Sequence, residues 1–491
     1  MPMCLQNISK KMKKTLILLA LLTINLSVFA QTAAKKTKAV SSKKETVVAP
    51  RPPMGWNSFD AYDCRINEEE YRQTVEYMDT HLKQYGWDYA VIDYVWFNHA
   101  PGNWNNPKRR HGHPNIRMTE DGKPLDKLVM DEYGRLLPSE QRFPSAAGGK
   151  GFKPLADWVH SKGMKFGIHI MRGIPRQAYF ENLPIKGTKY KAQDIAEPWD
   201  TCNWQNNLYG VDPTKAGAQE YYNSLFELYA QWGVDFIKAD DMMFPMYHKG
   251  EIEMMHKAIE RCGRPMVLSL SCGEAPIAQA EHLMKNANMW RISADFWDKW
   301  ESLRRNFDLM NAWAPHTREN RWPDADMLPI GKLSLQNRPH GKERMSEFTI
   351  PEHYTLMTLW SIARSPLMMG GDLLSTPQET IKTFLQNEEV LAVNQNSTDN
   401  RQIHEFHNGV VWIATDPKTG DRFVALFNIG EKTQKIEFDM EHEYMRDNYR
   451  LRDLWEKKNL GIVKSKISAE IEPHGARLYR LSKTNEKVTM N

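Results

Sequence analysis

The feature that most constrains this chain is a repeated order of helix, glycine and apolar strand. Four predicted helices each end at a glycine, and an apolar run follows each glycine. Glycine adopts the left-handed conformation that ends a helix, and strands apolar on both faces suit a parallel sheet covered by helices. The four pairs are Glu68–Tyr85 with Tyr89–Asp93, Leu155–Lys162 with Lys165–His169, Ala218–Trp232 with Val234–Lys238, and Glu251–Cys262 with Pro265–Ser269.

Four more apolar runs bring the predicted strands to eight, the number in a (β/α)8 TIM barrel. A doubly wound open sheet is the competing fold, but no GxGxxG or GxxxxGK[ST] loop follows the strands, which weakens its nucleotide-binding versions. The additional runs are Pro53–Asn57, Met289–Ile292, Met327–Ile330 and Pro366–Met369.

The pattern changes after about residue 396. Short alternating runs are now separated by closely spaced turn signals, which is typical of an antiparallel β sandwich. The predicted strands are Val410–Ala414, Arg422–Phe427, Gln434–Phe438 and Ala476–Leu481. The sequence therefore predicts an α/β catalytic barrel over residues 51–396 and a C-terminal β-sandwich domain over residues 397–491.

The first 50 residues differ from the rest of the chain. Lys11, Lys13 and Lys14 precede the apolar run Leu16–Ala30, which ends in small residues and is too short for a convincing membrane span. Residues 1–30 are therefore predicted to be a signal peptide, and residues 31–50, rich in Lys, Ala, Thr and Ser, a flexible linker. We expect export to the periplasm or the extracellular space, without membrane insertion after the signal is cleaved.

The charge distribution argues against nucleic acid as a partner. The first 50 residues hold nine Lys and one Glu, a net charge of +8, whereas the whole chain carries +4. Residues 51–491 are therefore mildly acidic, and a protein that neutralises phosphates needs a basic surface.

Three predicted strands deliver an aspartate to their carboxyl ends, where barrels place reacting groups. These are Asp93, Asp240 and Asp295. Hydrolysis of a glycosidic bond needs two carboxyls, one to attack the anomeric carbon and one to protonate the leaving oxygen. Lys238 lies on the same strand face as Asp240 and can keep it ionised, and Arg291 can bind sugar hydroxyls or the nucleophile. A strand-end Asp is often only a helix cap, and Asp241 and Asp298 are nearby rivals.

In these segments the chain resembles glycoside hydrolase family 27, the α-galactosidases and α-N-acetylgalactosaminidases of the melibiase type. The likeness covers nearly the whole mature chain and lies in Pro52–Ser58, Tyr89–Asp93, Gly233–Asp240, Trp290–Asp295, Asp324–Leu328 and Ala363–Leu367. It implies a retaining exo-glycosidase that removes terminal α-D-galactosyl residues by double displacement. Asp240 is then the nucleophile, Asp295 the acid/base, Trp56 an aromatic residue lining the sugar subsite, and Asp93 a ligand of the sugar hydroxyls. The family uses no metal and no organic cofactor.

The departures from the family pattern bear on the substrate. Tyr94 stands where α-galactosidases carry a second sugar-binding Asp, and His169 replaces a common Tyr. Val95 replaces a Cys that usually forms a disulfide, which leaves Cys64 without its usual partner. The loop Ser271–Pro276 also differs; there the resemblance puts Cys272 at the sugar, and Glu274 is expected to take over a sugar contact.

A second activity fits the same scaffold. The stretches Phe166–Arg176 and Asn288–Ser293 resemble a bacterial branch of the family that includes β-L-arabinopyranosidases. That sugar is the α-galactose ring without its hydroxymethyl group, so losing an acidic contact and gaining the bulky Tyr94 favours it. We keep β-L-arabinopyranosidase as the first alternative, and a catalytically inactive sugar-binding protein as the alternative of another class.

Other classes find little support. His160, His169 and His282 form no HExxH pattern, so structural histidines are expected instead of metal ligands, and no GxSxG elbow suggests an esterase. The five Cys lack a CxxC zinc pattern. The expected partner is therefore a carbohydrate, whereas the natural polysaccharide, the disulfide status and the oligomeric state are left undetermined.

Overall fold

The computed structural model describes residues 46–101, 119–120, 123–124, 127–335 and 342–486. The predicted signal peptide and all of the predicted linker before Thr46 lie outside the described residues. No helix within the described ranges is long and apolar enough to cross a membrane.

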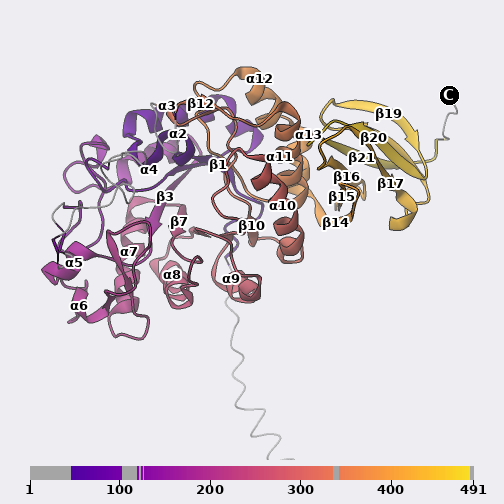
Figure 1. The fold of residues 1–491 in the computed structure, drawn as a ribbon. Helices are drawn as coiled ribbons and strands as arrows, with labels where there is room; N and C mark the ends of the chain where they lie inside the picture. The colour runs from indigo at the N-terminus through magenta and orange to yellow at the C-terminus, as the bar shows by residue number, and fades with distance from the viewer. Residues whose placement is uncertain (1–45, 102–118, 121–122, 125–126, 336–341, 487–491) are drawn as a thin grey trace, which may run out of the picture. The chain divides into compact units, whose positions relative to one another are not determined.

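Eight parallel strands form one curled sheet, in which neighbouring strands follow chain order (Figure 1). Its two edges meet where Leu328, just after β10, pairs in parallel with Met369 of β13. The ring of a TIM barrel is thereby closed, which confirms the predicted fold. The strands are β1 (Met54–Asn57), β2 (Tyr89–Ile92), β3 (Lys165–Met171), β7 (Phe236–Asp240), β8 (Val267–Leu270), β9 (Met289–Arg291), β10 (Trp322–Asp324) and β13 (Leu367–Met369).

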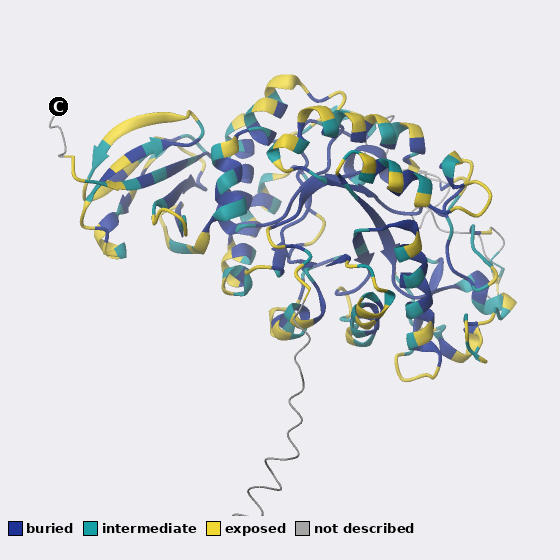
Figure 2. Cartoon of the chain, turned by 180° about the vertical axis from the view of Figure 1, so that it is seen from behind, coloured by how far each residue is buried: buried dark blue, intermediate teal, exposed yellow. Residues whose placement is uncertain are grey.

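Helices surround the strands, and Figure 2 shows the strands buried while the helices expose their outer faces. The predicted glycine stops are present: Gly233 and Gly263 have φ of +85° and +80° at the ends of α7 and α8. The helices are α3 (Glu68–His81), α4 (Lys153–Ser161), α7 (Ala218–Trp232), α8 (Lys249–Cys262), α9 (Ala280–Asn286), α10 (Trp300–Trp313), α11 (Ile350–Ala363) and α13 (Glu388–Asn396).

The connection between β3 and β7 carries a small three-stranded sheet of its own. The short strands β4 (Ile174–Pro175), β6 (Leu208–Val211) and β5 (Ala196–Glu197) pair in that order. This sheet holds the segment around Trp204 above the carboxyl ends of the barrel strands.

The barrel interior is filled by large apolar side chains, as the uninterrupted apolar strands require. Residues of the predicted linker reach the barrel at the amino end of β10. There the backbone N–H groups of Val48 and Ala49 donate to Oδ1 of Asn320 at 3.2 and 3.0 Å. The ordered chain thus begins slightly before residue 51. The interior cluster comprises Ala49, Tyr89, Val91, Phe236, Val267, Met289, Trp322, Met327 and Met368.

One predicted strand is wrong. The seventh barrel strand is β10, whereas the apolar run Met327–Ile330 contributes only the single bridge at Leu328. The chain turns between the two at Asp326, whose φ is +83°. Apolar content alone could not separate the strand from the packed turn that follows it.

The C-terminal domain is an antiparallel β sandwich, as predicted. A six-stranded sheet in the order β14-β15-β16-β21-β18-β19 faces the two-stranded sheet β17-β20 across an apolar core that includes Val424, Leu426, Ile436 and Phe438. Sequence reasoning missed four of the strands, β14, β18, β19 and β20, in which polar residues interrupt the apolar ones. The strands are β14 (Thr398–Phe406), β15 (Gly409–Thr415), β16 (Arg422–Asn428), β17 (Gln434–Asp439), β18 (Asn448–Asp453), β19 (Lys458–Val463), β20 (Lys466–Ile471) and β21 (Ala476–Thr484).

Helix α11 joins the two domains, because it is buried on nearly all sides. Its Thr355 hydroxyl donates to the carbonyl of His474 at 2.6 Å, and Trp455 Nε1 donates to Thr358 Oγ1 at 2.9 Å. A helix that is apolar all round must be covered on both sides. The sandwich therefore covers the face of α11 that the barrel leaves open.

Candidate active site

A cavity of about 450 Å³ lies at the carboxyl ends of the barrel strands. Most of its wall comes from the ends of β7 and β9 and from the segments after β1, β2, β7, β8, β9 and β10, and the loop between β5 and β6 supplies the rest. The lining residues are Phe59, Asp60, Asp93, Tyr94, Asn203, Trp204, Lys238, Asp240, Phe244, Pro245, Ser271, Cys272, Gly273, Arg291, Ala294, Asp295, Phe296, Trp297, Asp326 and Met327.

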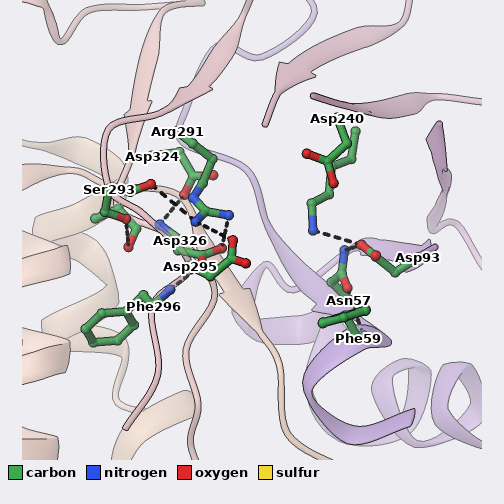
Figure 3. Close-up of polar contacts among 12 residues, drawn as sticks. Asn57, Phe59, Asp93, Asp240, Arg291, Ser293, Asp295, Phe296, Asp324 and Asp326 are labelled. Carbon is green, nitrogen blue, oxygen red and sulfur yellow. Dashed lines mark hydrogen bonds and ion pairs between the residues drawn. The ribbon is translucent and has the colours of Figure 1, made fainter. Parts of the chain in front are cut away.

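Lys238 and Asp93 form a buried ion pair on one side of this cavity. Figure 3 shows Asp93 and Asp240 on this side and Arg291, Asp295 and Asp326 on the other. Lys238 Nζ lies 2.9 Å from Asp93 Oδ2, and Asn57 Nδ2 donates to the same oxygen at 2.7 Å. Burial by itself would raise the pKa of Asp93, but the charges of Lys238 and His169, together with the hydrogen bonds from Lys238 and the backbone of Tyr94, lower that pKa well below its usual range. Asp93 is therefore a fixed anion, able to accept hydrogen bonds from hydroxyl groups.

Asp240, at the end of β7, is held by two donors. Oδ2 lies 2.9 Å from Nε2 of the buried His169, and Oδ1 accepts from the backbone N–H of Asp241 at 2.8 Å. Burial raises the pKa of Asp240, but the bond from His169 and the charge of Lys238 lower it by more, so the net shift is downward. A buried carboxylate that is kept ionised is the state that a nucleophile requires.

The second of these donors depends on an unusual backbone conformation. Asp241 has a φ of +61°, a region that side chains other than glycine seldom adopt. Arg172 spans this residue: its Nε donates to the Asp241 carbonyl at 3.0 Å and lies 2.8 Å from the Asp241 carboxylate, and its backbone N–H donates to the Asp240 carbonyl at 3.2 Å. Burial raises the pKa of Asp241 to about 7.

Arg172 is itself anchored by carboxylates behind the strand. Its two terminal nitrogens lie 2.9 and 2.7 Å from the two oxygens of Asp200, and Nη1 lies 3.1 Å from Glu251. Glu251 in turn accepts from the hydroxyl of Tyr222. This network fixes the turn that follows Asp240, and through that turn the N–H aimed at the Asp240 carboxylate.

Arg291 organises the opposite side of the cavity. Its Nη1 lies 2.8 Å from Asp326 and its Nη2 lies 3.1 Å from Asp295. The second oxygen of Asp326 accepts from the backbone N–H of Phe296 at 2.8 Å, which orients the segment that carries Asp295. The Asp295 side chain is 69% exposed, whereas that of Asp240 is 12% exposed. The two carboxylates thus share one cavity in unequal surroundings.

Beneath this side, buried acids accumulate next to Arg291. Burial and the neighbouring Asp326 raise the pKa of Asp324 to about 7, and burial likewise raises the pKa of Asp326 despite the nearby guanidinium. Asp60 is buried without a hydrogen bond to its Oδ2, and burial raises its pKa well above the usual range. The floor of the cavity therefore offers polar groups that a ligand can satisfy.

The structure brings most of the residues predicted from sequence to this cavity. His169 does not line the cavity but lies behind Asp240. There its ring meets the ring of Tyr94 edge to face, with 5.3 Å between the centroids. The predicted residues that do line the cavity are Asp93, Tyr94, Lys238, Asp240, Cys272, Arg291 and Asp295.

Two expected sugar contacts are not placed on the cavity wall. Trp56 is fully buried, because its Nε1 donates to the carbonyl of Gly371 at 3.0 Å and its ring packs edge-on against Tyr62. Glu274 points away and pairs with Arg305, with oxygens 2.7 and 2.6 Å from Nε and Nη2. Local motifs could not show either partner, since both come from distant parts of the chain.

Sequence reasoning also missed residues. Asp326 lies in the family-like segment Asp324–Leu328, for which the sequence predicts no role, and the only available signal was its spacing of two residues from Asp324. The wall aromatics Phe59, Trp204, Phe244, Phe296 and Trp297 gave no such signal, because their loops have no repeating pattern.

Asp200, His248 and Glu251 are the described side chains grouped closely enough to be considered as metal ligands. The guanidinium of Arg172 lies against both of these carboxylates. Because a cation already neutralises the group, its chemistry is that of a structural ion network. The four cysteines of the described ranges, Cys64 included, form no disulfide.

An eight-stranded barrel with two carboxylates in one cavity of sugar size defines a glycoside hydrolase. The protein-family model described as Alpha galactosidase A matches residues 213–396 of this sequence. The family model of the Alpha galactosidase C-terminal beta sandwich domain matches residues 407–481. The chain belongs to glycoside hydrolase family 27.

Solved structures with high similarity come from two bacilli. A family 27 β-L-arabinopyranosidase from Geobacillus stearothermophilus is 47% identical, over 90% of this chain and 98% of that one, with a TM-score of 0.83. A putative α-N-acetylgalactosaminidase from Bacillus halodurans is 43% identical, over 89% and 99% of the two chains, with a TM-score of 0.77. Alpha-galactosidase 2 of Arabidopsis thaliana is 28% identical over 89% of this chain and 90% of its own.

We predict that Arg172→Met destabilises the protein by about 3–5 kcal/mol, because it leaves buried carboxylates without their cation. Arg305→Met is the matched control: it breaks an exposed pair with Glu274, so the loss is expected to stay below about 1 kcal/mol. Thermal and urea unfolding followed by circular dichroism measure both. Equal stabilities of the two variants would contradict the role given to the Arg172 network.

Proposed function

We propose that this enzyme is a retaining exo-glycosidase in which Asp240 is the nucleophile and Asp295 the acid/base. The observation that carries the proposal is the inequality of the two carboxylates within one cavity. Asp240 is buried and held ionised by His169 and Lys238, whereas Asp295 faces solvent beside Arg291. One group suited to attack and one with access to water are what double displacement needs.

In the first step, an Asp240 oxygen attacks the anomeric carbon while Asp295 donates a proton to the departing oxygen. The carboxylate of Asp240 loses its negative charge as the glycosyl ester forms, and the N–H of Asp241 keeps the carboxylate plane fixed during attack. In the second step, Asp295 takes a proton from water as the water attacks the same carbon, and Asp240 is released.

The walls indicate how one terminal sugar is held. Lys238 and Arg291 offer donors, and Asp93, Asp326 and the unsatisfied Asp60 offer acceptors, on a floor of mostly buried residues. A closed floor with one open mouth suits the removal of single end residues. Sugars of galacto configuration match the family to which the chain belongs.

Among such sugars, the wall favours β-L-arabinopyranose over α-D-galactose. Tyr94 is buried at the wall, packed against His169 and Trp204 at 5.3 and 5.7 Å between ring centroids. Its bulk stands where α-galactosidases carry an Asp, which narrows the cavity and removes a hydroxyl acceptor. The 47% identity to an arabinopyranosidase supports the pentoside. The relatives named α-galactosidases support α-D-galactosides as the second substrate.

Asp240→Ala is predicted to lower kcat by a factor on the order of 10⁴ or more, because no covalent intermediate can form. Added azide is expected to restore turnover of a nitrophenyl glycoside and to yield a glycosyl azide. Asp298→Ala is the control, since Asp298 is bonded to Arg344 and to the backbone of Glu347 and azide should not raise its activity. Proton NMR showing an inverted first product would reject the mechanism.

Tyr94→Ala is predicted to raise the kcat/KM ratio of nitrophenyl α-D-galactoside to nitrophenyl β-L-arabinopyranoside by about tenfold or more, because the wall recedes. Tyr94→Phe removes only the hydroxyl, which has no hydrogen-bond partner among the described residues, so the ratio should stay within about twofold of wild type. If wild type released nitrophenol from neither compound, an inactive sugar-binding protein would be favoured.

We also propose that the protein is exported. The basic segment Lys11–Lys14 and the apolar run Leu16–Ala30 support this proposal. Mass spectrometry of protein recovered from outside the cytoplasm should find Gln31 as the first residue, and an uncleaved N-terminus would contradict the proposal.

A further inference from the structure

The cavity changes character between its floor and its mouth. The floor is polar and buried, with Asp93, Arg291 and Asp326 each at most 3% exposed. The mouth includes the exposed Asp295 and an aromatic ring, Phe244, that is 58% exposed although it belongs to the cavity wall. An exposed aromatic ring on the wall of a polar cavity is placed to contact a ligand that extends out of the cavity.

The ring of Phe244 is presented by a braced loop. After β7, the backbone N–H of Met242 donates to the carbonyl of Ser271 at 2.8 Å, and the N–H of His248 donates back to the carbonyl of Met242 at 2.9 Å. The tip between them carries Phe244 and Met246, both exposed. The loop base is thus fixed while its apolar tip stays in solvent.

Glycine places this ring beside the reacting groups. A Cβ at Gly273 would lie 2.1 Å from the Cβ of Phe244, so the loop packs directly on the Gly273 backbone, whose φ is +80°. The preceding residue, Cys272, lies in the field of both Asp240 and Asp295, which together with burial raise the pKa of its thiol. Phe244 therefore borders the region between the two carboxylates on its open side.

We propose that Phe244 forms a binding subsite for the sugar ring on the leaving-group side of the scissile bond. This inference rests on the proposed function, because Asp295 must protonate the leaving oxygen and so fixes the side on which the leaving sugar lies. The C–H face of a pyranose is apolar and covers an aromatic ring, while its hydroxyls remain in water. The subsite selects substrates in which the terminal sugar is linked to another sugar, as in an oligo- or polysaccharide.

The test compares substrates with and without a leaving sugar. For Phe244→Ala we expect KM for a disaccharide substrate to rise about five- to tenfold, while kcat/KM for the corresponding glycosyl fluoride stays within about twofold. Phe244→Trp should keep or lower the wild-type KM for the disaccharide. Phe406→Ala is the control, because Phe406 is 60% exposed on β14. Its loss should change neither the KM for the disaccharide nor the kcat/KM for the fluoride.

Binding separates this inference from the proposed function. In the Asp240→Ala background, Phe244→Ala should weaken binding of the disaccharide about five- to tenfold, as measured by titration calorimetry. The affinity for the free monosaccharide should stay unchanged. Equal loss on disaccharide and fluoride, or no loss on either, overturns the subsite. A lower molar mass in light scattering for Phe244→Ala would assign the ring to contact with a second copy and would also overturn it. Failure of wild type to cleave the fluoride counts against the proposed function alone.

Discussion

The contact between Lys238 and Asp93 is the constraint on which the site depends. A 2.9 Å ion pair joins β7 to the end of β2, and Asn57 ties β1 to the same carboxylate. Burial alone would lower the pKa of Lys238, but the surrounding aspartates raise it overall, so the cation persists. Without it, the carboxylates at the cavity floor would repel one another, and neutral forms would replace the charged ones that sugar chemistry needs.

The two sides of the cavity hold their carboxylates in different surroundings. Asp240 is surrounded by donors that are each held by another group: His169 by packing against Tyr94, and the N–H of Asp241 by Arg172. Among the described residues, Asp295 pairs with Arg291, and its side chain extends into solvent. Rigidity suits a nucleophile that must meet one carbon, whereas exposure suits a group that exchanges protons with a leaving group and with water.

The same arrangement explains why substrate choice is the variable part of the molecule. The ion network of Arg172 behind β7 does not line the cavity, so it does not depend on the substituents of a bound sugar. Tyr94 and Phe244 lie on the wall and at the mouth of the cavity. In the proposed substrate complex they meet the parts of a substrate that differ between glycosides. We therefore expect changes at these two positions to alter which glycoside is bound.

The sequence by itself determined the barrel, the sandwich and the strand-end aspartates. Glycine stops such as Gly233 and apolar strands such as β7 are local patterns, so their meaning does not depend on distant residues. It also led to Asp240, Asp295, Lys238 and Arg291, because parallel strands present their carboxyl ends at one face. The misplaced strand at Met327–Ile330 shows the limit, since an apolar turn and an apolar strand have the same composition.

Only the tertiary structure decided which side chains meet. In the folded protein, Trp56 donates a hydrogen bond to the carbonyl of Gly371, and Glu274 pairs with Arg305. Arg172, which follows β3, contacts the turn after Asp240. Each of these contacts joins residues from separate segments, and its energy depends on burial and angle, which no local pattern records. The candidate reacting groups could therefore be predicted from the sequence, whereas their orientation, charge and accessibility were set by the closure of the barrel.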